Sequence, residues 1–328
     1  MDLTSLYHSE IPSFLQEFSL TPPMERLKGI GMDCGCEYTN FPAYRHSINS
    51  SRFEHSLGTA LIIWHFTSDV TQTIAGLFHD ISTPVFSHTI DFLNKDYLLQ
   101  ESTENGTQEI ICQCQQIQAL FEKYKILSSN VCNYHLYPIA DNKSPRLSAD
   151  RLEYTLRKFI CFGTKTFDEL STFYSDLVVG KNEANENEIM FTNCETAIDF
   201  SFASLINSRN DISDEDRFAM QFLANVLETA LKKGILLPSD LYTTEEYVIY
   251  KLNQQIEMAK LWKKFCLFSK ILKTSEPPSD QRWFQIPAKK RYINPYVRSL
   301  GRAAALSESL NQEIQRYLNI DMNVWLTA

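Results

Sequence analysis

The sequence predicts an all-α protein with at most a small β element. Hydrophobic residues make up 44% of the 328-residue chain, which is enough to bury a sizeable core. Glycine and proline number only 10 and 12, too few for the many turns of an all-β sandwich. In residues 54–66 and 68–80, apolar side chains recur at i, i+3, i+4 and i+7. That spacing is typical of the buried face of a helix.

Further helices and one short strand are expected along the chain. Ser213 is a suitable N-cap, and the three acidic residues after it favour a first helical turn, where the helix dipole attracts negative charge. The segment 282–300 alternates enough to include a strand, and the polar, acidic stretch 180–188 predicts an exposed loop. The remaining helices are expected at 107–124, 148–161, 195–209, 213–234, 245–272 and 305–318.

We expect a metal-binding core at residues 1–165 and a helical extension at 166–328 that packs on it. Within the extension, residues 282–302 contain six basic side chains and no acidic one, with aromatic residues between them. Such a mixture can stack a base and hold phosphates, and it can equally be a solvated face or a contact in a homo-oligomer. The six basic residues are Arg282, Lys289, Lys290, Arg291, Arg298 and Arg302.

Composition also limits the expected location and partners. A net charge of -9 argues against a general nucleic-acid coat protein, so nucleic acid is a less favoured partner than a small anion. No run of about 18 apolar residues occurs, so no membrane-spanning helix is expected. The N-terminal sequence has no basic stretch before an apolar run, and eight cysteines are too sparse for a disulfide scaffold. A cytoplasmic protein with reduced thiols is the expectation.

Four polar residues stand at the ends of apolar helices. His79 and Asp80 end the second apolar helix, because the proline that follows disfavours its continuation. His55 begins the preceding helix, and two antiparallel helices joined by a short turn bring these ends together. Asp150, near the start of a later helix, supplies a second carboxylate. Buried polar groups need partners, and one divalent cation would satisfy all four, although each taken singly could be a satisfied core residue or a first-turn acid.

Four short motifs occur in order along residues 24–160. They are Arg52-Phe53-Glu54-His55-Ser56-Leu57-Gly58, Gly76-Leu77-Phe78-His79-Asp80, Phe86-Ser87-His88 and Asp150-Arg151-Leu152-Glu153-Tyr154. Together they resemble the HD-domain metal-dependent phosphohydrolases, and in motif they are closest to the deoxynucleoside-triphosphate triphosphohydrolases. The resemblance implies a helical core, hydrolysis of a phosphoester or phosphoanhydride, and one divalent metal ion. The metal ligands that it implies are His55, His79, Asp80 and Asp150.

The same resemblance implies roles for further residues. Arg52 matches a residue that contacts substrate phosphate, His88 a histidine that lines the substrate pocket, and Tyr154 an aromatic residue near the sugar. The catalytic candidates are therefore Arg52 as a positive clamp, His88 as an imidazole for proton transfer or substrate contact, and Glu101 as an acid. Glu54 is an alternative acid, or a partner that orients a metal ligand.

Two positions depart from the triphosphohydrolase pattern. Thr83 stands where those enzymes have a histidine three residues after the His-Asp pair, and Gln100-Glu101 stands where they have His-Glu. Threonine and glutamine do not transfer protons near neutral pH as imidazole does. His135 belongs to none of the motifs, and we expect it in the core or at the surface.

We therefore expect a metal-dependent phosphohydrolase that acts on a nucleotide or related phosphoester, with a metal-activated water as nucleophile. The cation could be Mn, Fe, Ni, Co, Zn or Mg. Two alternatives remain open. One is a nucleotide-binding regulator that retains the metal site with little or no turnover, which the departures at Thr83 and Gln100 favour. The other is a partner-binding protein on a degenerate scaffold.

Overall fold

A computed structural model of the chain describes residues 3–94, 106–276, 279 and 283–328. Helices dominate this part of the chain and two small sheets accompany them, so the predicted fold class is confirmed. The helices of the first half are α1 (Thr4–Tyr7), α2 (Ser13–Ser19), α3 (Pro22–Arg26), α4 (Pro42–Arg45), α5 (Arg52–Thr67), α6 (Val70–Phe78), α7 (Thr89–Leu93), α8 (Thr107–Gln113), α9 (Gln115–Tyr124), α10 (Ala149–Cys161) and α11 (Phe167–Ser175). Those of the second half are α12 (Cys194–Asn210), α13 (Asp214–Lys232), α14 (Glu245–Asn253), α15 (Ile256–Cys266), α16 (Ala303–Leu306) and α17 (Glu308–Leu318).

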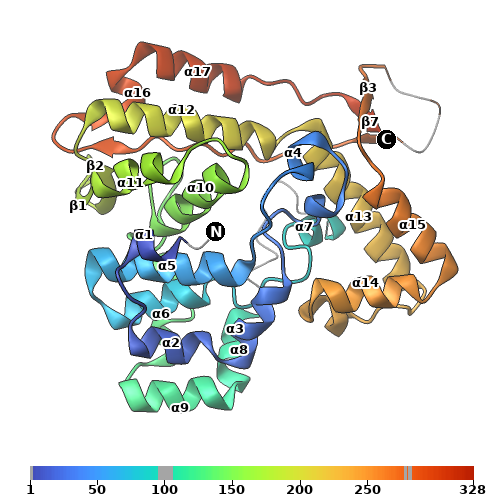
Figure 1. The fold of residues 1–328 in the computed structure, drawn as a ribbon, viewed down its shortest axis with the longest axis horizontal. Helices are drawn as coiled ribbons and strands as arrows, with labels where there is room; N and C mark the ends of the chain where they lie inside the picture. Colours follow the sequence, from blue (N-terminus) through green and yellow to red (C-terminus); the bar gives the residue numbers. More distant parts are fainter. Residues whose placement is uncertain (1–2, 95–105, 277–278, 280–282) are drawn as a thin grey trace.

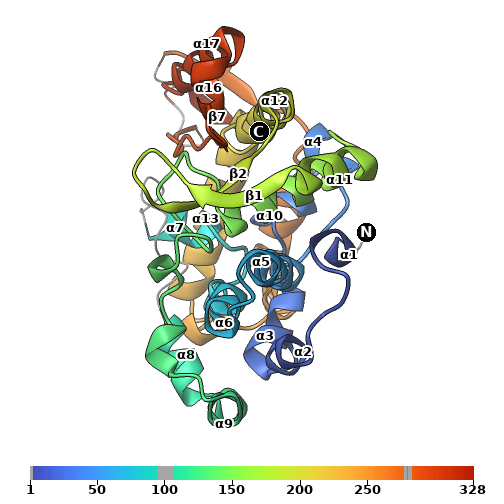
Figure 2. The same cartoon turned by 90° about the vertical axis from the view of Figure 1, so that its left-hand side faces the viewer.

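The larger helices lie in layers. From the bottom of Figure 1 to its top the order is α9, α6, α5, α10, α12 and α17, and the view turned by 90° in Figure 2 gives the same order. Helices α13, α14 and α15 form a separate group beside this stack (Figure 1). The stack places α10 between α5 and α12, and this arrangement determines the walls of the cavity described below.

Two clusters of buried side chains form the core. The first includes Leu61 of α5 and Phe200 of α12, and the second includes Phe86, which precedes α7, and Phe265 of α15. Each cluster therefore joins residues from both sides of position 165. The division of the chain at that position stays a prediction.

The strands form two short sheets. Strands β1 (Leu177–Lys181) and β2 (Asn187–Phe191) pair antiparallel, and the sheet continues through β5 (Tyr296–Val297) and β6 (Gly301–Arg302). The second sheet has the order β3 (Leu272–Thr274), β7 (Trp325–Thr327) and β4 (Phe284–Gln285). The β element expected within 282–300 thus corresponds to β4 and β5.

The expected loop at 180–188 is shorter in the structure, because its two ends belong to β1 and β2. The polar composition of this stretch favoured a loop over strands. Glu188 is nevertheless buried and pairs with Arg302, so a charged residue occupies an inward strand position. Only residues 182–186 connect the two strands, with Asn185 at a positive φ of 58°. Asparagine tolerates this backbone conformation better than most residues.

Two of the expected helices are each broken into a pair. The helix expected at 107–124 is interrupted at Cys114, and the one expected at 245–272 is interrupted at Gln255 and ends at Cys266. Both interrupting residues have extended backbones. Ile111 and Ile117, on either side of the first break, belong to the same buried cluster. Apolar spacing therefore continues across the break although the helix does not.

Glu245, the first residue of α14, joins the second half of the chain to loops of the first. Its Oε1 accepts the backbone N–H of Gly31 at 2.9 Å and that of Phe86 at 3.2 Å. Its Oε2 accepts the hydroxyl of Tyr38 at 2.8 Å. Because the side chain is only 3% exposed, these charge-assisted bonds are sheltered from water.

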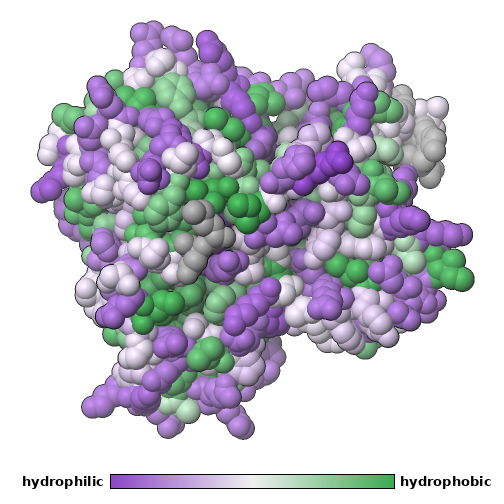
Figure 3. Space-filling view, in the orientation of Figure 1, coloured by the Kyte–Doolittle hydropathy of each residue, from purple (hydrophilic) through white to green (hydrophobic). Residues whose placement is uncertain are grey.

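Across the described residues, no helix combines the length and the apolar character that crossing a membrane requires. On the face drawn in Figure 3, hydrophobic residues occur in small groups among hydrophilic ones.

Candidate metal centre and its cavity

The start of α5 is fixed by a capping box. Ser51 Oγ accepts the backbone N–H of Glu54 at 3.3 Å, and the Glu54 carboxylate accepts the backbone N–H of Ser51 at 2.7 Å. This arrangement satisfies two backbone groups that a helix start leaves without partners. It also sets the first turn, which carries Arg52 and His55 into the interior. Glu54 therefore caps the helix, and the structure shows no contact between its side chain and a predicted metal ligand.

The Nε2 atoms of His55 and His79 point toward each other. His79 Nδ1 lies 2.7 Å from the carbonyl oxygen of Gly76, which can only accept, so this nitrogen carries the proton of the neutral ring. His55 Nδ1 likewise donates to Glu153 Oε2 at 2.6 Å. The two Nε2 atoms are 3.1 Å apart. Two lone pairs at this distance repel unless a proton or a cation lies between them.

Two carboxylates complete this group. Asp80 Oδ2 lies 3.6 Å from His79 Nε2 and 3.9 Å from His55 Nε2. Asp150 Oδ1, from the first turn of α10, lies 3.1 Å from His55 Nε2 and 3.7 Å from His79 Nε2. Ligand atoms of His55, His79 and Asp80 all lie within 4.8 Å of one another, and all three residues are buried. Imidazole nitrogens and carboxylate oxygens together suit a borderline divalent cation, so the residues present fit the predicted metal.

The electrostatics of the group favour a positive charge at its centre. Burial lowers the pKa of His55, but the neighbouring Asp150 and Glu153 carboxylates outweigh it and raise the pKa to about 9. Burial raises the pKa of Asp80, but Arg52 and the two histidines hold that pKa well below its usual range. The acids therefore stay ionised, and the same field that holds a proton on His55 would hold a cation.

Glu153 is the buried residue that orients His55. It lies three residues after Asp150 on the same face of α10 and is fully buried. Besides His55, its carboxylate accepts Arg157 Nε at 2.9 Å and the hydroxyl of Tyr7 at 3.3 Å. Metal-binding histidines commonly donate their other N–H to such a carboxylate. The sequence analysis missed this role, although the spacing Asp150-x-x-Glu153 was the available signal.

Both oxygens of Asp80 are held by neighbouring side chains. Arg52 Nη1 donates to Oδ2 at 2.9 Å, and Thr83 Oγ1 donates to Oδ1 at 2.9 Å. Arg52 Nε also donates to Ser87 Oγ at 3.0 Å, which fixes the guanidinium. Thr83, which replaces a histidine of the triphosphohydrolase pattern, is thus a support for a predicted metal ligand.

A cavity of about 700 Å³ opens onto this group. The four predicted metal ligands line it together with Arg52, His88 and Tyr154, whereas Glu54 does not. Gln100 and Glu101 lie outside the described residues. The cavity is also lined by residues that the sequence analysis did not assign to a site: Tyr134, His135, Asp141, Arg151, Lys158, Ser204, Asn207, Ser208, Asp211 and Asp216.

His88 and Tyr154 are neutral hydrogen-bonding groups in this cavity. His88 Nδ1 lies 2.8 Å from Asp91 Oδ2 and donates to it. Burial lowers the pKa of His88 below its usual value, and nearby Arg52 acts in the same direction against the opposing effect of Asp91. Burial also raises the pKa of Tyr154 to about 12, so its hydroxyl keeps its proton near neutral pH.

His135 is a second imidazole in the cavity. Its Nδ1 lies 2.8 Å from Asp141 Oδ2, and its ring centre lies 4.2 Å from that of Tyr134. The Tyr134 ring is in turn 5.3 Å from the ring of His79. About half of the His135 side chain is exposed. This position follows from the fold of the segment before α10, which no short motif marks.

The basic segment 282–302 divides between the cavity and other contacts. Lys289 and Arg291 line the cavity. Lys290 instead donates to the carbonyl oxygens of Leu318 and Ile320 at 2.6 and 2.7 Å, and Arg302 pairs with Glu183 and Glu188. Arg298 is exposed, and Arg282 lies outside the described residues. Among the five basic residues of this segment that the structure describes, Lys289 and Arg291 are thus the two that line the cavity.

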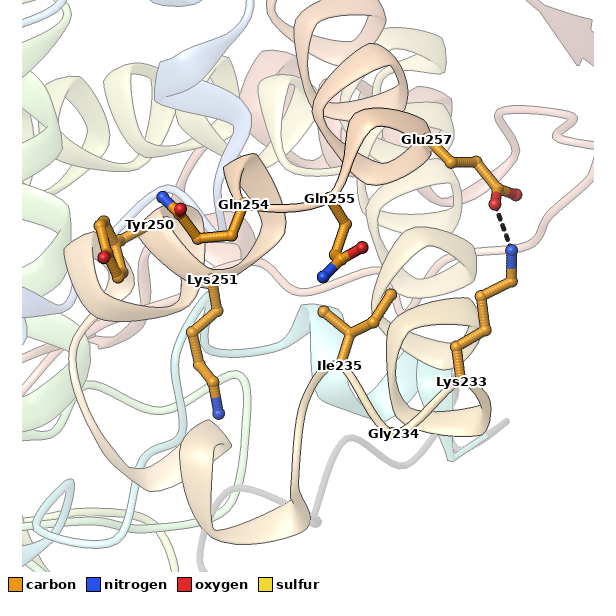
Figure 4. A pocket seen from close by; sticks show the side chains of 8 residues that line it. All are labelled: Lys233, Gly234, Ile235, Tyr250, Lys251, Gln254, Gln255 and Glu257. Carbon is orange, nitrogen blue, oxygen red and sulfur yellow. Dashed lines mark hydrogen bonds and ion pairs between the residues drawn. The ribbon is translucent and has the colours of Figure 1, made fainter.

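A second cavity, of about 620 Å³, lies where α13 ends and α14 and α15 meet (Figure 4). Lys233 and Glu257 form an ion pair at one side of it, and Lys251, Tyr250 and the two glutamines line the other (Figure 4). None of the eight lining side chains is an imidazole or a thiol, and the single carboxylate is paired. The groups that can bind a metal and transfer protons therefore gather in the other cavity.

Comparisons with known proteins agree with this geometry. No model of a known protein family matches the chain. The uncharacterized protein YdhJ of Bacillus subtilis is 26% identical over 254 residues, which cover 76% of this chain and 74% of YdhJ. The metal-dependent phosphohydrolase cns2 of Cordyceps militaris is 28% identical over 178 residues, which cover 52% of this chain and 48% of cns2.

The crystal structure of a phosphohydrolase from Bacteroides thetaiotaomicron has the same fold. It superposes with a TM-score of 0.62 at 16% identity, covering 97% of this chain and 96% of that one. The protein thus has a phosphohydrolase fold built around a buried His/His/Asp group. It has phosphohydrolase homologues, one of which is metal-dependent, in agreement with the class expected from the motifs.

Proposed function

We propose that this protein is an HD-type, metal-dependent phosphohydrolase that removes phosphate from a nucleotide or a similar phosphorylated small molecule. The observation that carries the proposal is the pair of facing Nε2 atoms of His55 and His79, 3.1 Å apart, with the Asp80 and Asp150 carboxylates beside them. Each Nδ1 donates to an acceptor of the protein, so both Nε2 atoms can present a lone pair to one cation that takes the place of a proton between them. A divalent cation is the partner that this donor set fits.

The proposed ligands are therefore His55, His79, Asp80 and Asp150. When bound, a divalent cation lowers the pKa of water and polarises a phosphoryl oxygen. Arg52, already fixed by Asp80 and Ser87, would place a guanidinium beside a phosphate oxygen. Lys289 and Arg291 add positive charge to the same cavity.

Two imidazoles are candidates for proton transfer, and they differ in character. His88 has a lowered pKa and its proton on Nδ1, which leaves Nε2 as an acceptor suited to a base or to substrate contact. His135 Nδ1 lies 2.8 Å from Asp141 Oδ2, which orients the ring and leaves Nε2 for a leaving group. We propose His135 as the proton donor to the leaving group. It would take the place of the histidine that Thr83 replaces.

The regulator remains the second candidate, and Thr83 favours it. A threonine that donates to Asp80 supports the metal ligand but cannot protonate a leaving group near neutral pH. In that case the protein would bind metal and nucleotide without turnover.

The test is phosphate release from a panel of nucleotides and simple phosphoesters with Mn, Mg, Ni, Co or Fe. Metal analysis of the purified protein is run in parallel. We expect Asp80→Ala to lower both bound metal and kcat/KM by at least about 100-fold, the upper end of losses for residues that only support a ligand. His65→Ala is the matched control, because His65 lies on α5 but at its exposed end.

Activity that survives the loss of Asp80 would contradict the proposed mechanism. Bound metal together with a nucleotide-dependent rise in melting temperature, but no phosphate release, would favour the regulator. For the proton donor, His135→Asn should lower kcat and remove the alkaline limb of its pH profile, whereas His88→Asn should act mainly on KM or on the acidic limb.

A further inference from the structure

One wall of the cavity is a polar face of α12. Ser204, Asn207, Ser208 and Asp211 all line the cavity. Their positions follow the spacing i, i+3, i+4 and i+7, which places them on one side of the helix and of the residue that follows it. Ser204 and Asn207 are only 3% and 4% exposed, so this part of the wall is an interior surface, whereas Ser208 is half-buried and Asp211 is exposed.

The two serines present acceptors to the cavity. Ser204 Oγ donates its proton to the carbonyl oxygen of Ser201 at 2.9 Å, and Ser208 Oγ donates to that of Ser204 at 3.0 Å. A serine hydroxyl has one proton and two lone pairs. Because both protons are used within the helix, the oxygens have only lone pairs left for a ligand.

Asn207 presents a further acceptor. Its Nδ2 donates to the carbonyl oxygen of Thr155 in α10 at 3.4 Å, and because that carbonyl can only accept, this contact fixes which end of the amide points away from α10. Its Oδ1 has no hydrogen-bond partner among the residues that the structure describes. Because Asn207 lines the cavity, this oxygen can accept a hydrogen bond from a donor that enters it, whether water or a ligand group.

An ion pair forms the end of the wall. Asp211 follows α12 and pairs with Lys158 of α10, which also lines the cavity. The ion pair satisfies the lysine, and no other positive side chain on this wall would bind an anion. Apart from this paired lysine the wall therefore presents acceptors, in contrast to the metal end, where the Arg52 guanidinium lies beside Asp80.

We infer that the α12 wall binds the organic part of the phosphorylated substrate through hydrogen bonds that the substrate donates, from sugar hydroxyls or from amino groups. The inference rests on the proposed function and adds the substrate class. The phosphate lies at the metal end, and the other end carries hydroxyl or amino groups and no second phosphate. A buried acceptor discriminates strongly against an analogue that lacks the matching donor, because the acceptor is then left unpaired.

The test compares three phosphate monoesters: ribose 5-phosphate, adenosine 5′-monophosphate and phenyl phosphate, which has no donor on its organic part. Asn207→Leu removes the free acceptor at similar volume, and Ser204→Ala removes one oxygen without adding bulk. Ser201→Ala is the matched control: Ser201 is also buried in α12 and also donates to a helix carbonyl, but it does not line the cavity.

We expect wild-type protein to prefer a donor-bearing ester over phenyl phosphate by at least tenfold in kcat/KM. Asn207→Leu should reduce this preference at least tenfold and Ser204→Ala about threefold, while Ser201→Ala leaves it within twofold of wild type. A loss seen for both ribose 5-phosphate and the nucleotide assigns the donors to the sugar. A loss confined to the nucleotide assigns them to the base. An equal preference in all four proteins overturns the inference.

Failure of the proposed function gives a different result. If wild-type protein loaded with each metal releases phosphate from none of the three esters, the hydrolase assignment is wrong. The inference is then decided by dissociation constants for the same esters in the same variants, with the same fold-changes expected. Melting temperatures check that each variant is folded. If Asn207→Leu does not fold, Ser204→Ala alone decides whether the α12 wall binds donors of the substrate.

Discussion

The two ends of the cavity are built on opposite principles. At the metal end, each oxygen of Asp80 already has a donor, and both histidines are oriented through their second nitrogen. At the α12 end, the Asn207 oxygen has no partner within the described chain, and Asp216 is a buried acid with another acid nearby. The first arrangement fixes a reaction geometry in advance, whereas the second leaves interactions for a ligand to complete.

The largest predicted effect concerns the less satisfied end. Burial, with Asp211 nearby, raises the pKa of Asp216 to about 7, against the hydrogen bonds from Tyr44 and Cys36 and the charge of Lys158. In the unfolded chain the Asp216 carboxyl loses its proton near pH 4, whereas in the folded protein it keeps the proton up to about pH 7. Stability from this group is therefore complete below about pH 4 and is lost as pH rises to about 7. The full loss is at most about 4 kcal/mol.

Asp216→Asn should remove this dependence, since the amide oxygen can still accept the Tyr44 hydroxyl. Urea unfolding at pH 4.5 and pH 7.5 measures it. The free energy of unfolding of the variant should rise relative to that of wild type between pH 4.5 and pH 7.5. If the difference in free energy between the two proteins is the same at both pH values, the pKa of Asp216 is not raised in the folded protein.

The next effect concerns the metal end. Glu153→Gln keeps the size of the side chain but removes the charge that orients His55, so we expect metal affinity to fall about 10- to 100-fold. Metal titration measures the change. Glu54→Gln is the matched control on α5, because Glu54 caps the helix and does not contact a ligand. Equal losses in both variants would mean that the effect is loss of helix stability and not of ligand orientation.

The smallest effect separates scaffold from site. Ser51→Ala removes the side-chain half of the capping box and should lower the free energy of unfolding by about 1 kcal/mol. The contacts of His55 with Glu153 and Asp150 remain, so metal affinity should change less than in Glu153→Gln. Denaturant unfolding and metal titration on the same protein compare the two. A loss of metal affinity as large as that in Glu153→Gln would show that the cap itself positions the ligands.

The same contrast explains what the sequence could predict. The residues of the metal end stand in short contiguous motifs at helix ends, so local spacing alone indicated that His55, His79 and Asp80 meet. Residues of the other end cannot be recognised in this way. Ser204, Asn207 and Asp211 form a polar stripe that normally indicates a solvated helix face, and only the packing of α12 against α10 buries Ser204 and Asn207.

Other differences have the same origin. The break at Cys114 leaves the apolar spacing unchanged, and the hairpin near Glu188 has a loop-like composition because its inward charge is paired with a residue over a hundred positions away. His135 lines the cavity because the segment before α10 folds back beside the metal ligands. Each depends on contacts between distant segments, which a reading of short windows does not contain.

The Glu245 bonds have a consequence for how the protein can be divided. One carboxylate from α14 holds the backbone at Gly31 and Phe86, and Phe86 adjoins Ser87, which fixes Arg52. A fragment that stops at residue 165 would keep every predicted metal ligand but would leave those two amides without their acceptor. We therefore expect a fragment of residues 1–165 to hold Arg52 less firmly than the whole chain does, and recombination between relatives should preserve residue 245 together with the loops that it holds.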